Sequence, residues 1–267
     1  MDAMNKALSY SSLDKFNKCA LQFKRMKATD YKREAIYDRK NARGTIFHRF
    51  MQELNNDRIL RGKWMSQANA GDLMNDLWTN GFPTKEDASL NILEAPQWGY
   101  DNFLAKSISD SQLFIPMIYD EVIPHLNPVE AEAYRSIKLE VPGKQYTNLH
   151  GEIDLINDPN GIIDWKTVER ARRSDTEDLD IQATIYAAIS GFTRCSVHFV
   201  QFIFLRRDPP RIQWNTTKRD TRHIDWLMKT YLPAVVQQIE ADIMPPAPGW
   251  HCDWCNTPCG IRPEIGA

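Results

Sequence analysis

The chain has 267 residues, 42% hydrophobic and 25% charged, a composition typical of one large or two modest globular domains. Its formal net charge of −2 argues against general binding to polyanions, and because no apolar run of about 18 residues occurs, we expect no membrane span. The N-terminal stretch lacks an apolar core followed by small residues, which predicts no secretory signal and a cytoplasmic location.

Helical spacing of apolar residues dominates the first half of the chain. Residues 8–29 predict a helix with Ser11 or Ser12 as N-cap, and residues 44–60 predict a second helix with one apolar side. Residues 64–126, interrupted near Gly81–Pro83 and at Pro96, are expected to be mostly helical. We therefore interpret residues 1–267 as a single domain in which residues 60–133 form a helical insertion or subdomain.

Strand patterns begin near residue 134. Residues 136–143 alternate, residues 148–157 and 161–168 predict two strands joined by a DPNG turn, and residues 177–190 return to helical spacing. Residues 195–205 predict a buried strand, residues 211–216 a short strand, and residues 218–243 a closing helix. This order predicts an α/β or α+β core with a helical insertion.

Four of the five cysteines fall near the chain ends. Cys252, Cys255 and Cys259 are spaced C-x2-C-x3-C within residues 245–262, which we expect to pack on the N-terminal helix that carries Cys19. In a cytoplasmic protein this spacing favours a metal over disulfides, and four thiolates suit a [4Fe–4S] cluster or Zn²⁺. His251 could replace one thiolate in a zinc site, and free thiols in a surface turn are the alternative. Cys195 is expected to be a small core residue.

The segment HGEIDLINDPNGIIDWKT, residues 150–167, carries three charged residues on two predicted strands. Asp164 and Lys166 are two residues apart and therefore share a face, and Asp154 on the preceding strand can face them across the turn. Two adjacent carboxylates repel unless a cation lies between them, and oxygen ligands suit Mg²⁺ or Mn²⁺. Lys166 could then orient or help deprotonate a water. The alternative is a surface Lys–Asp ion pair on an ordinary hairpin.

These residues resemble the core motif of the PD-(D/E)XK nuclease superfamily in its RecB-like branch, which predicts a restriction-endonuclease-like α/β core with a mixed central sheet flanked by helices. Gln182 and Tyr186 resemble the Q-x-x-x-Y motif of that branch, and His48 resembles its helix-borne histidine. The first and last cysteine segments resemble those of nucleases whose termini are joined by an iron–sulfur cluster, such as the CRISPR-associated RecB-like exonucleases and the AddB nuclease domain.

The resemblance implies a DNA exonuclease that requires Mg²⁺ or Mn²⁺. The metal ligands would be His48, Asp154, Asp164 and the Trp165 carbonyl. Lys166 would position the attacking water, and Gln182 and Tyr186 would support the site or contact the strand. A cluster on Cys19, Cys252, Cys255 and Cys259 would be structural. Glu152 is interpreted as a solvated carboxylate, with a supporting role or a second-ion role as alternatives.

The expected substrate is DNA, with single-stranded ends favoured. Residues 15–43 carry ten Lys or Arg against three acids, and Lys15, Lys18, Lys24, Arg25 and Lys27 could line a channel with Trp64, Trp78 or Trp98. The absence of a Walker P-loop predicts a separate helicase or recombination partner, or a stand-alone enzyme. The pathway would be recombination, repair or CRISPR-linked processing, in a host cytoplasm if the protein is phage-encoded. A non-catalytic DNA-binding or assembly subunit and a structure-specific endonuclease are the alternatives.

Overall fold

The computed structural model describes residues 6–28, 39–81, 99–141, 146–171, 180–204 and 209–247, together with residues 249 and 252. Within this part of the chain, six strands form one mixed sheet with the order β1-β3-β4-β5-β6, and β2 also pairs with β3. The strands are β1 (Lys6–Ser9), β2 (Pro128–Lys138), β3 (Tyr146–Asn157), β4 (Gly161–Val168), β5 (Arg194–Ile203) and β6 (Arg211–Asp220). The β1–β3 and β4–β5 pairs are parallel, and the other pairs are antiparallel.

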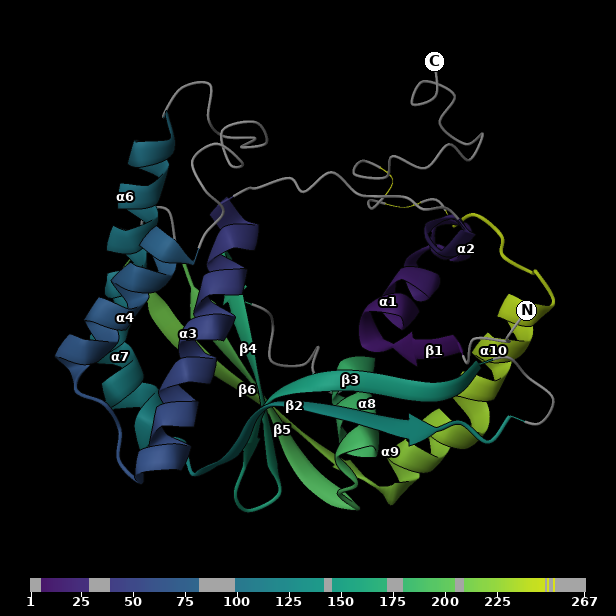
Figure 1. The fold of residues 1–267 in the computed structure, drawn as a ribbon. Helices are drawn as coiled ribbons and strands as arrows, with labels where there is room; N and C mark the ends of the chain where they lie inside the picture. Colours follow the sequence, from purple (N-terminus) through teal and green to yellow (C-terminus); the bar gives the residue numbers. More distant parts are fainter. Residues whose placement is uncertain are drawn as a thin grey trace.

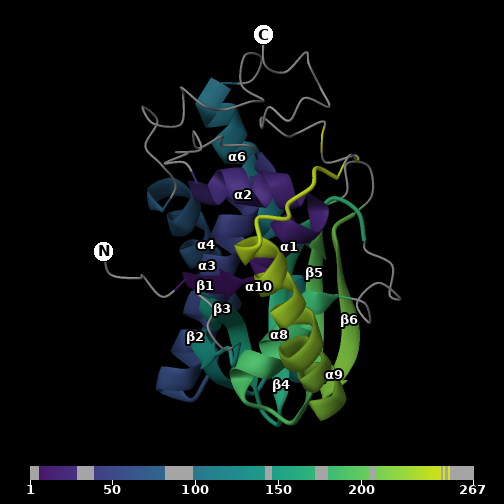
Figure 2. The same cartoon turned by 90° about the vertical axis from the view of Figure 1, so that its right-hand side faces the viewer.

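Helices cover both faces of the sheet (Figures 1 and 2). On one side lie α3 (Arg39–Arg61), α4 (Gln67–Asn80), α6 (Gly99–Gln112) and α7 (Phe114–Met117), followed by the π-helical turn η1 (Ile118–Val122) and the 3₁₀ turn η2 (Ile123–His125). On the other side lie α1 (Tyr10–Lys18), α2 (Ala20–Ala28), α8 (Ile181–Ser190), α9 (Thr221–Trp226), the π-helical turn η4 (Leu227–Tyr231) and α10 (Leu232–Glu240). None of the described helices is both long enough and apolar enough to cross a membrane.

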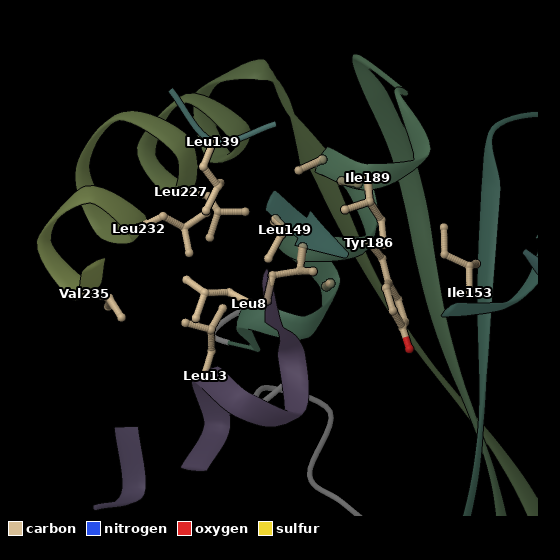
Figure 3. Packing of buried hydrophobic residues seen from close by; sticks show 14 of the residues in the cluster. Leu8, Leu13, Leu139, Leu149, Ile153, Tyr186, Ile189, Leu227, Leu232 and Val235 are labelled. Atoms are coloured by element: carbon tan, nitrogen blue, oxygen red, sulfur yellow. The ribbon is translucent and has the colours of Figure 1, made fainter. Parts of the chain in front are cut away.

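Two apolar clusters fill the two layers. The first, between α1, α8, η4, α10 and the sheet, includes Leu13, Leu149 and Leu232, and Figure 3 shows these side chains converging. The second, between α3, α4, α6, α7 and the opposite face, includes Phe47, Trp165 and Phe202. Each cluster removes large aliphatic and aromatic side chains from water, which is the main contribution to the stability of such a fold.

Strand β3 determines where the sheet opens. β2 pairs with β3 along most of its length, from the Pro128–Asn157 pair to the Lys138–Asn148 pair. The opposite edge of β3 is divided, because its registered pairs with β1 end at His150 and those with β4 begin at Leu155. The sheet therefore splits beside residues 151–154, next to the predicted Asp154.

The N-terminus differs from the sequence expectation. Residues 6–9 are a strand rather than loop and helix, and the N-cap of α1 is Ser9, not Ser11 or Ser12. Ser9 and Ser12 form a reciprocal capping box, in which the Ser12 N–H donates to Ser9 Oγ at 3.3 Å. The predicted helix is also interrupted at Cys19, which is extended at φ −162°. Pairing of β1 with β3 depends on a contact between distant segments, which helical periodicity cannot reveal.

Three other boundaries shift. β2 begins at Pro128, so residues 128–133 of the predicted insertion belong to the sheet, while residues 82–98 lie outside the described part. β6 continues to Asp220, and the closing helix starts at Thr221 rather than residue 218 because the Asp220 side chain caps it. The helix predicted over residues 44–60 is confirmed within α3, where Ile46, Phe47, Phe50, Met51 and Leu54 are buried.

Candidate functional site

Strands β2 and β3 change the face they present at one level of the sheet. Ala131 packs against the second cluster while Ala133 belongs to the first, and Ile153 belongs to the first while Leu155 belongs to the second. Residues two apart in a regular strand point to the same face, so both strands are distorted at the residue between. On β2 that residue is Glu132, whose φ of 50° is left-handed backbone. Such strained conformations cluster at functional sites.

The distortion brings side chains from both layers to the opening in the sheet. The registers Ala131–Leu155 and Ala133–Ile153 place Glu132 opposite Asp154. Asp154 is buried, and its Oδ2 accepts a hydrogen bond from the Trp165 backbone N–H at 2.8 Å. This carboxylate therefore links β3 to β4 just where their regular ladder stops.

His48 reaches the same carboxylate from α3. Its Nδ1 lies 3.4 Å from Asp154 Oδ2. Burial lowers the pKa of His48, but the hydrogen bond and charge of Asp154, together with the charge of Asp164, outweigh burial and raise that pKa above its ordinary value. The imidazole thus lies in a field set by two carboxylates.

Asp164 is held by side chains of α8. Gln182 Nε2 donates to Asp164 Oδ1 at 2.9 Å, and the Tyr186 hydroxyl donates to the same oxygen at 3.0 Å. Gln182 Nε2 also donates to the Tyr186 oxygen at 2.8 Å, so the three groups form a closed network. Figure 3 shows the Tyr186 ring beside the apolar cluster with its hydroxyl directed away from the leucine side chains. Residues four apart on a helix share a face, and here that face meets the acidic strand.

Lys166 completes the surroundings of Asp164. Its Nζ lies 2.7 Å from Asp164 Oδ2, and the Asp164 residue is only 1% exposed. Because Asp164 is buried, the alternative of a surface Lys–Asp ion pair on an ordinary hairpin is wrong. Burial raises the pKa of Asp164 and outweighs the opposing effect of Lys166, while the Asp154 charge adds to the rise. Burial likewise raises the pKa of Tyr186 well above its ordinary range, so its hydroxyl stays a donor.

Glu132 is a candidate site residue that the sequence did not reveal. One ligand atom from each of His48, Glu132 and Asp154 lies within 4.8 Å of the other two. Burial, followed by the charges of Asp154 and Glu152, raises the pKa of Glu132 to about 7, and its carboxyl also interacts directly with Glu152. The surrounding VEAEA gives no signal, because the side chain enters the site only through the left-handed backbone at residue 132.

The donor set fits a hard divalent cation. An imidazole nitrogen and several carboxylate oxygens are typical ligands of Mn²⁺, and carboxylates alone suit Mg²⁺. The three grouped residues include His48 and Asp154 from the predicted ligand set, with Glu132 in addition. Asp164 adjoins them but is bonded to Gln182, Tyr186 and Lys166, so its role as a ligand stays a prediction, as does that of the Trp165 carbonyl.

Gly151, three residues before Asp154, lies where a larger side chain would not fit. A Cβ added to Gly151 would lie 2.9 Å from Ile189 Cδ1 and 4.0 Å from Tyr186 Cε1. Gly151 thus allows α8, which carries Gln182 and Tyr186, to lie close against β3. α8 itself starts at the Asp180 cap and ends at Gly191, whose φ of 78° suits glycine.

The predicted strand-binding residues are only partly described. Trp78 is fully buried and its indole N–H donates to Ser111 Oγ at 3.0 Å, so it is a core residue rather than a stacking surface. Lys18 pairs with Asp14 and Lys24 with Asp242, both at 2.6 Å. Trp98 and the side chains of Arg25 and Lys27 lie outside the described part.

The cysteine site is also only partly described. Cys19 is buried at the junction of α1 and α2, and the Cys252 N–H donates to the Gly249 carbonyl at 2.9 Å. His251, Cys255 and Cys259 lie outside the described residues, so a metal bound by Cys19, Cys252, Cys255 and Cys259 stays a prediction. Cys195 is buried in β5, which confirms its expected place in the core.

The chain is similar in fold to solved structures. One solved structure, named "putative exonuclease" and from Eubacterium rectale, has a TM-score of 0.55 and 12% identity, covering 95% of this chain and 88% of that chain. Another, named SSO0001, has a TM-score of 0.36 and 12% identity, covering 81% of this chain and 96% of that chain. A search of curated proteins finds no match.

The first of these likenesses confirms the predicted restriction-endonuclease-like fold, a mixed sheet flanked by helices. A model of one protein family, described as the PD-(D/E)XK nuclease superfamily, matches residues 7–259. That range contains β3 and β4, which carry Asp154 and Asp164, and α8, which carries Gln182 and Tyr186. The chain therefore belongs to the PD-(D/E)XK nuclease superfamily.

Proposed function

We propose that the protein is a DNA exonuclease that depends on Mg²⁺ or Mn²⁺ and hydrolyses phosphodiester bonds, acting on single-stranded ends. The main support is the buried Asp164, paired with Lys166, next to the His48, Glu132 and Asp154 group. Burying this many carboxylates is costly without a cation to neutralise them. A site that concentrates negative charge beside one ammonium group is suited to a divalent ion and a phosphate.

Each residue has a role in this proposal. His48, Glu132, Asp154 and Asp164 would hold the cation, which when bound supplies Lewis-acid polarisation and a lowered pKa for its water. Lys166, held by Asp164 Oδ2, would orient the attacking water or stabilise negative charge that develops on the phosphate. Gln182 and Tyr186 would fix Asp164 Oδ1 and so keep Lys166 in place.

The finer assignment rests on the order of the motifs. The succession His48, Asp154, Asp164, Lys166, Gln182 and Tyr186 resembles the RecB-like branch, and the structurally similar Eubacterium rectale protein carries the name exonuclease. We infer a role in recombination, repair or CRISPR-linked DNA processing, with a separate helicase or recombination protein as partner. A structural [4Fe–4S] cluster on the four cysteines completes the proposal.

The activity test uses purified protein, Mn²⁺ or Mg²⁺, and end-labelled linear or circular DNA in single- and double-stranded forms. We expect release of labelled ends from linear single strands and no cutting of circles. Asp164→Ala should abolish turnover, whereas Asp72→Ala, which removes an exposed acid of α4, is the matched control. Cleavage by Asp164→Ala at the wild-type rate would refute the site.

Two further outcomes separate the alternatives. Cutting of circular DNA would identify an endonuclease, and metal-dependent DNA binding with no turnover on any substrate would identify a binding or assembly subunit. After anaerobic purification, a brown protein with stoichiometric iron and sulfide supports the cluster. A colourless protein with one zinc per chain would replace the cluster by a zinc site.

A further inference from the structure

Two cavities lie side by side at the end of the sheet that contains the β3–β4 turn. The first has a volume of about 590 Å³, and Asn160, Arg194, Ser196, Lys218, Asp220 and Arg222 are among its lining residues. The second has a volume of about 600 Å³, and Asp120, Glu121, His125, His198, Trp214 and Thr216 are among its lining residues. The Ser196–Lys218 pair of β5 and β6 adjoins the His198–Thr216 pair, so the cavities are neighbours on one face. Each has a volume typical of a small-molecule site.

The first cavity carries an excess of positive charge. Its single carboxylate, Asp220, is already bound by two Arg222 hydrogen bonds of 2.8 and 3.1 Å and lies 2.7 Å from His223 Nδ1. Arg194 lies opposite Asp220 in the register, and Lys218 lies two residues before it. Within the described part of the chain, no carboxylate pairs with either Arg194 or Lys218. These two cations therefore face the cavity without a counter-charge.

An arginine and a lysine on adjoining strands suit a phosphate group. Opposite residues in an antiparallel pair have Cβ atoms about 5 Å apart, and diagonal neighbours such as Arg194 and Lys218 lie about 7–8 Å apart. A guanidinium fork and an ammonium at that separation can contact different oxygens of one phosphate. Arg219, by contrast, is turned into the protein, where it donates to Thr184 and Thr217.

The second cavity is aromatic and has polar groups on its walls. The Trp214 ring lies edge-to-face against His125 at 5.6 Å and against His198 at 5.8 Å. The Trp214 Nε1 donor is buried, and nothing in the described residues accepts its hydrogen bond. His198 Nδ1 is 2.8 Å from Thr216 Oγ1, which fixes the ring. The indole and imidazole rings suit contact with a flat heterocycle.

The two cavities differ in charge, and this difference sets the orientation of a ligand that fills both. Asp120 and Glu121 line the aromatic cavity and would repel a phosphate there, while their oxygens can accept hydrogen bonds from an amino group of a base. Lys218 and Trp214 are four residues apart on β6, about 13 Å along the strand, and the long lysine side chain can shorten this span to the distance between phosphate and base in one nucleotide. We propose that the two cavities together bind one nucleotide, with its phosphate between Arg194 and Lys218 and its base beside Trp214.

This site is separate from the candidate cation site. Ile163 lines the aromatic cavity, whereas Asp164, the next residue of β4, points to the opposite face toward α8. The nucleotide can be a free monophosphate or the terminal residue of a DNA strand, since both present the same chemistry. The proposal does not depend on catalysis at Asp164.

The test measures binding in EDTA by calorimetry, with dAMP, deoxyadenosine and inorganic phosphate as probes. We expect dAMP to bind at least about tenfold more tightly than either fragment, because it engages both cavities. Arg194→Ala/Lys218→Ala should weaken dAMP binding at least about tenfold and leave deoxyadenosine binding unchanged. Lys63→Ala/Lys229→Ala, which also removes two exposed cations, is the charge-matched control and should bind dAMP like the wild type.

Three results would overturn the proposal: dAMP binding no tighter than phosphate, wild-type affinity in Arg194→Ala/Lys218→Ala, or loss of dAMP binding in His48→Ala. The last result would place the nucleotide in the catalytic centre instead. A 5′-phosphorylated oligonucleotide distinguishes the two sources. Competition with dAMP by this oligonucleotide assigns the site to a strand terminus, and dAMP binding without competition assigns it to a free nucleotide.

Discussion

Tyr186→Phe tests how the candidate site is held together. The change removes one hydroxyl that donates to Asp164 Oδ1 at 3.0 Å and accepts from Gln182 at 2.8 Å, and it leaves the buried ring in place. A hydrogen bond to a charged group contributes about 1.5–3 kcal/mol, and in a chain of this size each kcal/mol shifts Tm by about 2–4 °C. We therefore expect Tm to fall by about 3–12 °C in metal-free buffer.

The assay combines thermal unfolding by circular dichroism with the Mn²⁺ dependence of DNA cleavage. Because Asp164 Oδ1 keeps Gln182 as its remaining donor, the variant should fold but require a higher Mn²⁺ concentration for half-maximal rate. Tyr231→Phe is the matched control, since its hydroxyl donates at 2.7 Å to the neutral Asn17 side chain in an exposed contact. If Tyr186→Phe and Tyr231→Phe are indistinguishable in both measurements, Tyr186 does not hold Asp164.

Other predictions concern the elements that position the site. Ser9→Ala removes the capping box of α1 and should cost about 1 kcal/mol in urea unfolding. Ser136→Ala, which changes an exposed serine of β2, should be neutral, and equal effects of the two changes would contradict the capping assignment. Gly151→Ala places a Cβ 2.9 Å from Ile189 Cδ1 and should lower the free energy of unfolding by about 1–3 kcal/mol. Adding Ile189→Val removes the Cδ1 atom and should recover part of that loss. If Gly151→Ala is neutral, α8 can move away from β3 freely. Glu132→Gln should raise the Mn²⁺ concentration needed for thermal stabilisation, while Glu130→Gln on the same strand should not; equal responses would remove Glu132 from the cation site.

The local parts of the site could be predicted from the sequence. Asp164 and Lys166 share a face because strand alternation is a property of neighbouring residues, and Gln182 and Tyr186 share a face because helical periodicity is equally local. Asp164 is buried because β4 lies between β3 and β5, whereas Lys166 stays partly exposed.

The parts that were missed depend on distant contacts or on unusual backbone. Strand β1 exists because residues 6–9 pair with β3, some 140 positions away in sequence, as in the Lys6–Tyr146 pair. Glu132 reaches Asp154 only because its φ is 50°, a conformation that sequence alternation does not anticipate and that reverses the side-chain pattern of β2.

The charges of the site make a final prediction about protons. Glu132, Asp164 and His48 all have raised pKa values, so the metal-free cluster offsets part of its negative charge by binding protons. For Glu132 the ordinary value of 4.5 rises to about 7, so between these values the folded chain binds more protons than the unfolded chain. Its contribution to stability therefore falls as pH rises through that window, and the raised pKa of His48 acts in the same direction at higher pH.

A divalent cation would replace these protons, since carboxylates and imidazole bind metal in their deprotonated forms. Calorimetric titration with Mn²⁺ at slightly acidic pH, in buffers of different ionisation enthalpy, should therefore show proton release, and metal affinity should rise with pH toward neutrality. Glu132→Gln should reduce the number of protons released. Glu130→Gln, which changes a carboxyl on the same strand, should release as many as the wild type. If Mn²⁺ binds without proton release at any pH below neutral, the cation binds elsewhere and the carboxyls of Glu132 and Asp164 are not its ligands.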